Sequence, residues 1–234
     1  MSREPSTVVI TGGNRGIGLG FATHYAEAGW RVIATCRDPA AAASLRRLRS
    51  RHPGAVQIRA LDVADHAQIE GLAGHLDGTG VDLLINNAGW GDRRAELADV
   101  TYESWERAMR VNAFATLKMA QVLVDRVARS AGRTIVTLSS QMGSIGENDS
   151  GTRYAYRASK AAANMIVKTL AVDLAPRGII VVSLHPGWVK TSLGGPGALL
   201  SVEDSVRAMA TVIDGLTAGD SGQFLDHRGR RIPW

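Results

Sequence analysis

Short apolar runs rich in β-branched residues alternate with helical stretches along all 234 residues, and this alternation limits the possible folds more than any other feature. The runs are apolar throughout, which is typical of strands buried on both faces of a parallel sheet. We therefore expect an α/β fold with a doubly wound, mainly parallel seven-stranded sheet and helices on both faces. The expected strands are residues 7–11, 31–35, 56–60, 81–85, 134–138, 179–184 and 223–225.

Helices are expected between these strands, and some carry start or stop signals. Asp38 is interpreted as the N-cap and Pro39 as the first residue of a helix rich in alanine and arginine. The other expected helices are residues 15–28, 65–76, 102–130, 152–175 and 202–216. We find no repeat, low-complexity tract or linker, so residues 1–234 are predicted to form one domain.

Composition and charge exclude several classes of protein. No apolar run reaches the roughly 20 residues that a membrane span needs, and the opening residues lack a signal-peptide core, so we expect a cytoplasmic protein without a membrane span. The single Cys36 cannot form an internal disulfide or a cysteine-rich metal site, and no metal is predicted. The net charge of +5 comes largely from residues 46–51 and 228–231. No set of aromatic residues for base stacking accompanies them, so a solvated basic face is favoured over nucleic-acid binding.

A glycine-rich turn follows the first expected strand, in the order Thr11-Gly12-Gly13-Asn14-Arg15-Gly16-Ile17-Gly18. Glycines permit a tight turn and close approach of the backbone to a pyrophosphate, and the N-terminus of the next helix offers free N–H groups. A tight turn without a ligand is the alternative. The strand–turn–helix context favours a Rossmann dinucleotide site, with cofactor contacts expected from Gly12, Asn14, Arg15, Gly16, Ile17 and Gly18.

The end of the second expected strand indicates which dinucleotide is bound. NAD sites of this kind usually place an acidic residue there for the ribose 2′-OH, whereas this chain has Arg37. A guanidinium at Arg37 suits a 2′-phosphate, and Arg15 provides a second cation. Each arginine alone is also explained as a surface residue. Together they favour NADP(H) over NAD(H).

Tyr156 and Lys160 stand four residues apart, on one face of an expected helix. A free phenol has a pKa of about 10, too high for an efficient base at neutral pH. The Lys160 ammonium is expected to lower the pKa of Tyr156 and to make it a proton donor and acceptor. In isolation, such a pair is more often an ordinary surface pair on a helix.

These motifs, together with Asn86-Asn87-Ala88-Gly89, Asn112 and Ser139-Ser140, resemble the short-chain dehydrogenase/reductase family over nearly the whole chain. Residues 34–39, 185–191 and 232–234 resemble its branch of C-factor and sniffer-like carbonyl reductases. The resemblance implies that Asn112, Ser140, Tyr156 and Lys160 are catalytic. Asn112 would hold a water relay, and Ser140, rather than Ser139, would bind the substrate oxygen.

The resemblance also assigns the remaining cofactor contacts. Asp62 and Val63 should line the adenine site, and Asn87, Ala88 and Gly89 the adenosine ribose. The nicotinamide should lie against Pro186, Gly187, Val189 and Thr191, with Tyr156 and Lys160 beside it.

One departure concerns the spacing of the catalytic residues. Ser140 and Tyr156 are sixteen positions apart, whereas much of the family uses thirteen. Three glycines lie between them, so we expect a longer loop to absorb the difference.

The predicted function is reduction of a small-molecule carbonyl compound to an alcohol, or the reverse, with NADP(H). Trp90, Met142 and Trp188 are candidates for an apolar substrate wall, although ordinary packing explains them equally well. An extended-branch epimerase or dehydratase is disfavoured by the short chain. A cofactor-binding regulatory protein of C-factor type is the alternative. The sequence does not indicate the substrate, the oligomeric state or the role of Pro233-Trp234.

Overall fold

Seven strands form one sheet in the order β3-β2-β1-β4-β5-β6-β7, and every neighbouring pair is parallel. The computed structural model describes residues 5–76, 78–91 and 96–234. The strand order reverses direction between β1 and β4, which is where ligands of open α/β sheets bind. The predicted fold is confirmed. The strands are β1 Thr7–Ile10, β2 Arg31–Cys36, β3 Val56–Ala60, β4 Leu83–Asn86, β5 Thr134–Leu138, β6 Ile180–His185 and β7 Phe224–Asp226.

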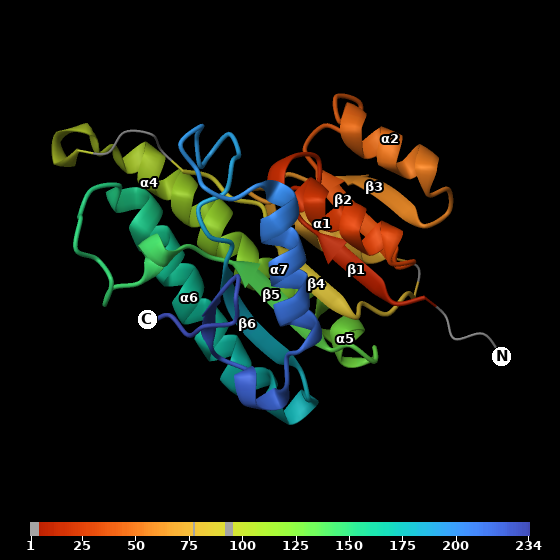
Figure 1. The fold of residues 1–234 in the computed structure, drawn as a ribbon. Coiled ribbons are helices and arrows are strands. Elements are labelled where there is room, and N and C mark those ends of the chain that lie inside the picture. The colour runs from red at the N-terminus through yellow and green to blue at the C-terminus, as the bar shows by residue number, and fades with distance from the viewer. Residues whose placement is uncertain (1–4, 77, 92–95) are drawn as a thin grey trace.

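Helices cover both faces of the sheet (Figure 1). On one face lie α1 Gly16–Glu27, α2 Ala43–Arg51 and α7 Val202–Asp214, and on the other lie α3 His66–Gly74, α5 Ala115–Ala128 and α6 Tyr154–Leu174. Helix α4, Tyr102–Met109, packs beside α6. Within the described residues, no helix combines the length and apolarity that crossing a membrane requires.

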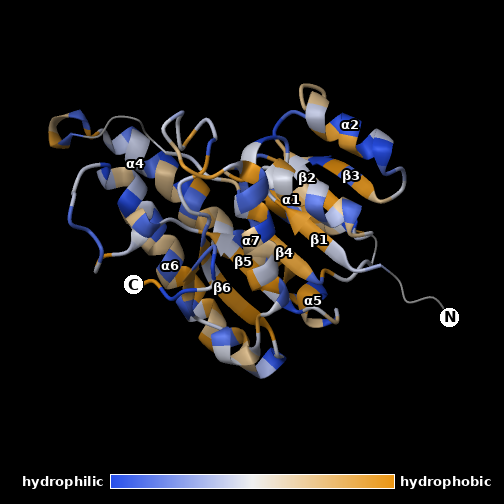
Figure 2. Cartoon of the chain, viewed as in Figure 1, coloured by the Kyte–Doolittle hydropathy of each residue, from blue (hydrophilic) through white to orange (hydrophobic). Residues whose placement is uncertain are grey.

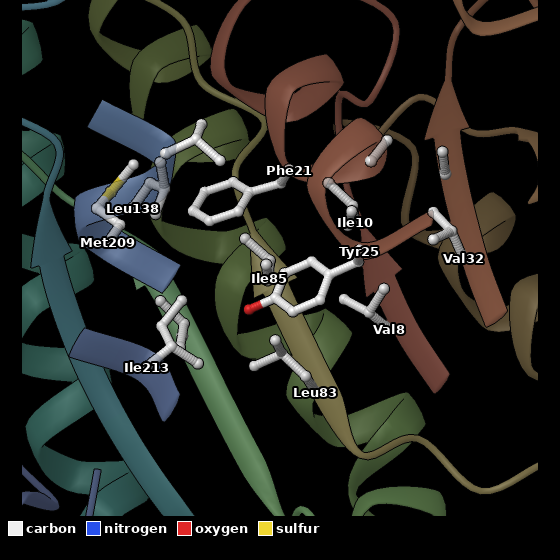
Figure 3. Packing of buried hydrophobic residues seen from close by; sticks show 14 of the residues in the cluster. Val8, Ile10, Phe21, Tyr25, Val32, Leu83, Ile85, Leu138, Met209 and Ile213 are labelled. Carbon is white, nitrogen blue, oxygen red and sulfur yellow. The ribbon is translucent and has the colours of Figure 1, made fainter. Parts of the chain in front are cut away.

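The alternation of side chains along each strand creates two cores. In β1, Val8 and Ile10 pack under α1 and α7, whereas Val9 faces the opposite helical layer. Figure 3 shows Phe21 and Tyr25 of α1 packed over β1 and β4. Because both faces of the inner strands are buried, these strands are mostly apolar, whereas the edge strand β3 also carries Gln57 and Arg59 (Figure 2).

Two predicted helices differ from the structure. Asp38 does not cap a helix: its Oδ1 accepts the backbone N–H groups of Ala40 at 2.9 Å and Ala41 at 3.1 Å, which closes a turn. Helix α2 therefore begins only at Ala43. The helix expected over 102–130 is interrupted by a π-helical segment, Arg110–Phe114, between α4 and α5. Such π-bulges are frequent at functional sites, and this one contains Asn112.

Candidate active site

A cleft of about 650 Å³ opens at the carboxyl ends of the strands, where the strand order reverses. Loops after six of the strands contribute to its wall. The predicted site residues that line it are Gly12, Asn14, Arg15, Gly16, Ile17, Arg37, Asp62, Val63, Asn87, Ala88, Gly89, Trp90, Tyr156, Lys160, Pro186 and Thr191. The structure thus brings the two ends of the predicted site, the glycine turn and the Tyr–Lys pair, into one cleft.

The glycine turn is packed too closely for side chains. Gly12 has a φ of +67°, and a Cβ added there would lie 3.1 Å from the Cα of Ala88. A Cβ on Gly18 would lie 2.3 Å from the carbonyl oxygen of Gly12. Gly18 does not line the cleft. It is buried behind the turn and allows α1 to approach it.

Two polar side chains brace this turn against the loop after β4. Asn87 Nδ2 donates to the carbonyl oxygens of Thr11 at 2.7 Å and Gly12 at 3.2 Å. In return, Thr11 Oγ1 accepts the backbone N–H groups of Asn87 and Ala88, both at 3.0 Å. Asn87 therefore has a bracing role in addition to its place on the cleft wall. Sequence reasoning did not anticipate this role for Thr11.

Positive charge gathers at the glycine-turn end of the cleft. Helix α1 begins at Gly16, and its N-terminus has neither a side-chain cap nor an acidic residue in the first turn. Arg15 and Arg37 are exposed on the cleft wall and have no hydrogen-bond or ion-pair partner within the part of the chain that the structure describes. This end of the cleft offers free N–H groups and two unpaired guanidinium groups for an anion.

At the other end, Lys160 is buried behind Tyr156. Its side chain is 5% exposed, and Nζ lies 5.9 Å from the centroid of the Tyr156 ring. Nζ donates to the carbonyl oxygen of Leu138, at the end of β5, over 2.6 Å. Burial lowers the pKa of Lys160 to about 8 because the charged ammonium loses its hydration.

Tyr156 does not show the lowered pKa that the sequence predicted. Burial raises the pKa of Tyr156, and this effect exceeds the opposing effects of its hydrogen bond with Ser140 and of the Arg153 charge. The Lys160 ammonium donates to the carbonyl oxygen of Leu138, and its Nζ lies over the Tyr156 ring. Lys160 is not among the groups that lower the pKa of Tyr156, so the expectation that its ammonium depresses this pKa is not borne out.

Asn112 lies in the π-helical segment and joins two parts of the site. Its Nδ2 donates to the carbonyl oxygen of Trp90 at 2.7 Å and to Ser159 Oγ at 2.9 Å, while its Oδ1 accepts the Trp90 N–H at 2.8 Å. Its own carbonyl oxygen accepts the hydroxyl of Thr116 at 3.0 Å. The buried Asn112 side chain thus fixes the loop after β4 against α6 and is not on the cleft wall.

Ser140 is held next to Tyr156 by a short 3₁₀ turn, Gln141–Gly143. Ser140 Oγ accepts the Met142 N–H at 3.2 Å, and the Ser140 side chain lies near enough to Tyr156 to lower the pKa of its phenol. A Cβ on Gly143 would lie 2.8 Å from the Cβ of Lys160, so the turn rests directly on α6. The longer spacing is taken up by the loop that follows. Ser139 lines the cleft, and its buried hydroxyl has no partner among the described residues.

The predicted substrate residues are only partly brought together. Trp90 lines the cleft, with the Arg107 guanidinium 5.2 Å from its ring centroid. Met142 and Trp188 do not line the cleft. Trp188 is 54% exposed, and its Nε1 donates to the carbonyl oxygen of Gly194 at 2.8 Å.

Sequence reasoning missed several cleft residues, among them Gly91, Arg107 and Leu193. A Cβ on Gly91 would lie 2.9 Å from Leu193 Cδ1 and 3.1 Å from Tyr156 Cδ2, so only a glycine lets the chain pack this closely against Leu193 and the Tyr156 ring. In the sequence, the position of Gly91 directly after Trp90 was the only sign that it belongs to the cleft.

Two residues predicted to touch the nicotinamide lie behind the cleft wall. Val189 is 3% exposed and forms an isolated parallel bridge with Leu200. Gly187 has a φ of +80° and packs beside Leu200 and His227. Both support the loop that carries Pro186 and Thr191 to the cleft. No group of three or more potential metal ligands occurs among the described residues.

Comparison with known proteins decides the family. A family model described as short chain dehydrogenase matches residues 6–196. The chain belongs to this family. Two solved structures are similar to this short-chain dehydrogenase over nearly its whole length. An NADPH-bound carbonyl reductase from chicken fatty liver is 35% identical, with a TM-score of 0.93 over 99% of this chain and 100% of its own. The carbonyl reductase Sniffer of D. melanogaster is 32% identical, with a TM-score of 0.92 over 99% of this chain and 100% of its own.

A third relative of this short-chain dehydrogenase is a protein named C-signal, from Myxococcus xanthus. It is 45% identical over 154 residues, which cover 66% of this chain and 93% of the relative. The predicted resemblance to the C-factor and sniffer-like branch is therefore confirmed, and with it membership of an oxidoreductase family.

Proposed function

We propose that this short-chain dehydrogenase reduces a small carbonyl compound with NADPH and that Tyr156 donates the proton. One observation carries the proposal: Tyr156 stands one helical turn from buried Lys160, in the cleft that the glycine turn also lines. A binding protein has no need of a phenol placed in this way. The NADPH-bound carbonyl reductase among the solved relatives supports the same conclusion.

The residues present fit a dinucleotide with a 2′-phosphate. The absence of side chains at Gly12 and Gly16 leaves the backbone open to a pyrophosphate at the uncapped N-terminus of α1. The free guanidinium groups of Arg15 and Arg37 would bind the 2′-phosphate with charge-assisted hydrogen bonds. When bound, the nicotinamide supplies the hydride.

The protein's own contribution is to supply and replace one proton. Because burial raises its pKa, the Tyr156 phenol stays protonated at neutral pH and is ready to donate to a carbonyl oxygen. Ser140, whose side chain lowers the pKa of Tyr156, would donate to the same oxygen and stabilise the charge that develops there. Lys160, with a pKa of about 8, is a suitable source for the replacement proton. Asn112 keeps this arrangement in place through Ser159.

A regulatory role remains the second candidate, and the similarity to C-signal is the observation that favours it. In that case the cleft would bind the nucleotide as a signal, and turnover would be incidental. The two candidates differ in what they require of the phenol oxygen.

The proposal is tested with Tyr156→Phe, which removes only that oxygen. NADPH affinity, measured by nicotinamide fluorescence, should stay within about twofold, while oxidation of NADPH by a panel of aldehydes, ketones and quinones should fall by at least ~10²-fold. Wild-type turnover that survives this substitution would refute the role of Tyr156. NADPH binding without turnover of any carbonyl would favour the regulatory candidate.

A further inference from the structure

The last residues of the chain lie against the loop that follows Ser140. After β7 the chain turns back on itself, so that Arg231 pairs with Leu225 and the Ile232 N–H donates to the carbonyl oxygen of Phe224 at 2.8 Å. This reversal directs Pro233 and Trp234 towards the loop over residues 144–147.

Four hydrogen bonds join these two segments. The carbonyl oxygen of Trp234 accepts the N–H groups of Ile145 at 2.9 Å and Gly146 at 3.0 Å. The Ser144 hydroxyl donates to the carbonyl oxygen of Pro233 at 2.6 Å and is shared with that of Trp234 at 3.3 Å. Ser144 is only 2% exposed, so these bonds are largely protected from water.

Trp234 is itself fixed to the sheet. Its ring stacks on Phe224 of β7, with centroids 5.6 Å apart and the planes inclined by 21°. Phe224 is 1% exposed, so the indole rests on a rigid core residue. Stacked aromatic pairs of this kind contribute beyond the apolar area they bury. Trp234 thus connects β7 to the loop over residues 144–147.

The connection continues to the catalytic pair. The Gly143 N–H donates to the carbonyl oxygen of Ser140 at 2.7 Å, and the Ser144 N–H donates to that of Gln141 at 2.9 Å. Gly143 packs on the backbone of Lys160, and the Ser140 side chain is near enough to Tyr156 to lower its pKa. A displacement of residues 144–146 therefore reaches Ser140 through one short turn.

We infer that Pro233 and Trp234 are positioning residues for catalysis: they hold the loop over residues 144–147 so that Ser140 stays aligned with Tyr156. This inference rests on the proposed reductase activity. The loop needs such support because the spacing of sixteen between Ser140 and Tyr156 makes it long, and its tip over residues 147–151 is mostly exposed. Neither Trp234 nor residues 144–147 line the cleft, so their effect on cofactor affinity should be small.

The test compares Trp234→Ala with Trp234→Phe. The alanine variant should lose kcat by about tenfold or more with an unchanged Kd for NADPH, because small displacements of catalytic groups have effects of this size. The phenylalanine variant, which keeps a ring on Phe224, should recover most of the loss. In the alcohol-oxidising direction, the alanine variant should become active only at higher pH, because Tyr156 loses the hydrogen bond that lowers its pKa.

Trp30→Ala is the matched control. It removes a partly buried tryptophan that packs on Tyr25 at 4.8 Å, far from the loop, and should reduce stability without changing kcat or the pH profile. Three results would overturn the inference: kcat of Trp234→Ala within twofold of the wild type, parallel losses of kcat and NADPH affinity, or an equal loss of kcat in Trp30→Ala.

Failure of the proposed function would give a different result: the wild-type protein itself would not turn over any carbonyl compound. In that case, the effect of Trp234 on the loop over residues 144–147 is tested by hydrogen exchange at backbone amides. Faster exchange of the Met142 and Gly143 amides in Trp234→Ala, but not in Trp234→Phe, supports the positioning role. Unchanged exchange at these amides overturns it.

Discussion

His185 makes a specific prediction about stability in acid. It ends β6, directly before the Pro186 loop at the cleft, and its Nδ1 is buried with no hydrogen-bond partner among the described residues. Burial, reinforced by the neighbouring His227 charge and opposed by Asp226, lowers its pKa from 6.5 to about 4. Between these two pH values the unfolded chain binds a proton that the folded protein does not bind. Stability must therefore fall as the pH falls through this window.

The size of this effect follows from the two pKa values. A group with a pKa of 6.5 in the unfolded chain and about 4 in the folded protein lowers the free energy of unfolding by about 2 kcal/mol at pH 5 and about 3 kcal/mol at pH 4. His185→Gln removes this titration but leaves the aspartates and glutamates unchanged. Their contributions to the pH dependence of the unfolding free energy therefore cancel when the variant is compared with the wild type.

The assay is urea unfolding at pH 7, 5 and 4, followed by tryptophan fluorescence. The loss of unfolding free energy between pH 7 and pH 5 should be smaller in His185→Gln than in the wild type by about 2 kcal/mol. His75→Gln, at an exposed histidine, is the control and should keep the wild-type loss. Equal losses in the wild type and His185→Gln would refute the reasoning.

Two further predictions concern the cofactor end of the cleft. Arg37→Asp should weaken NADPH binding by about 10–100-fold through the lost charge-assisted bonds, with little effect on NADH, as measured by nicotinamide fluorescence; equal losses for both nucleotides would contradict the 2′-phosphate contact. Gly18→Ala places a Cβ 2.3 Å from Gly12 O and 2.5 Å from Asn87 Nδ2, so it should cost about 1–3 kcal/mol in urea unfolding and displace the turn that we propose binds NADPH. Gly71→Ala, where a Cβ meets nothing within 4 Å, is its control, and the same loss in both variants would show that crowding is not the cause.

The strands and most helices were predictable because their signals are local. Uniformly apolar β-branched runs give strands buried on both faces, and the helix expected from residue 65 is present as α3, with Asp65 accepting the N–H groups of Ala67 and Gln68. Asp38 shows the limit of such signals. A carboxylate can cap a turn as well as a helix, and only the path from β2 decides which N–H groups it meets.

The candidate site divides in the same way. The spacing of Tyr156 and Lys160 places them on one helix face whatever surrounds them, and the glycine turn limits its own backbone. The partners of Asn112 were not predictable, since Trp90 and Ser159 lie 22 and 47 residues away. The absence of Met142 and Trp188 from the cleft wall likewise depends on loop paths that periodicity does not describe.

The sequence by itself determined the order of strands and helices, the family, and the residue types at the chemical site, because these depend on periodicity and short spacings. Only the tertiary structure decided the direction in which the pKa of Tyr156 moves, because that direction depends on how much water the whole fold removes from the phenol. It also decided where Pro233 and Trp234 lie. Their partners, Ser144 and Ile145, are nearly ninety residues away along the chain, and folding alone brings them together.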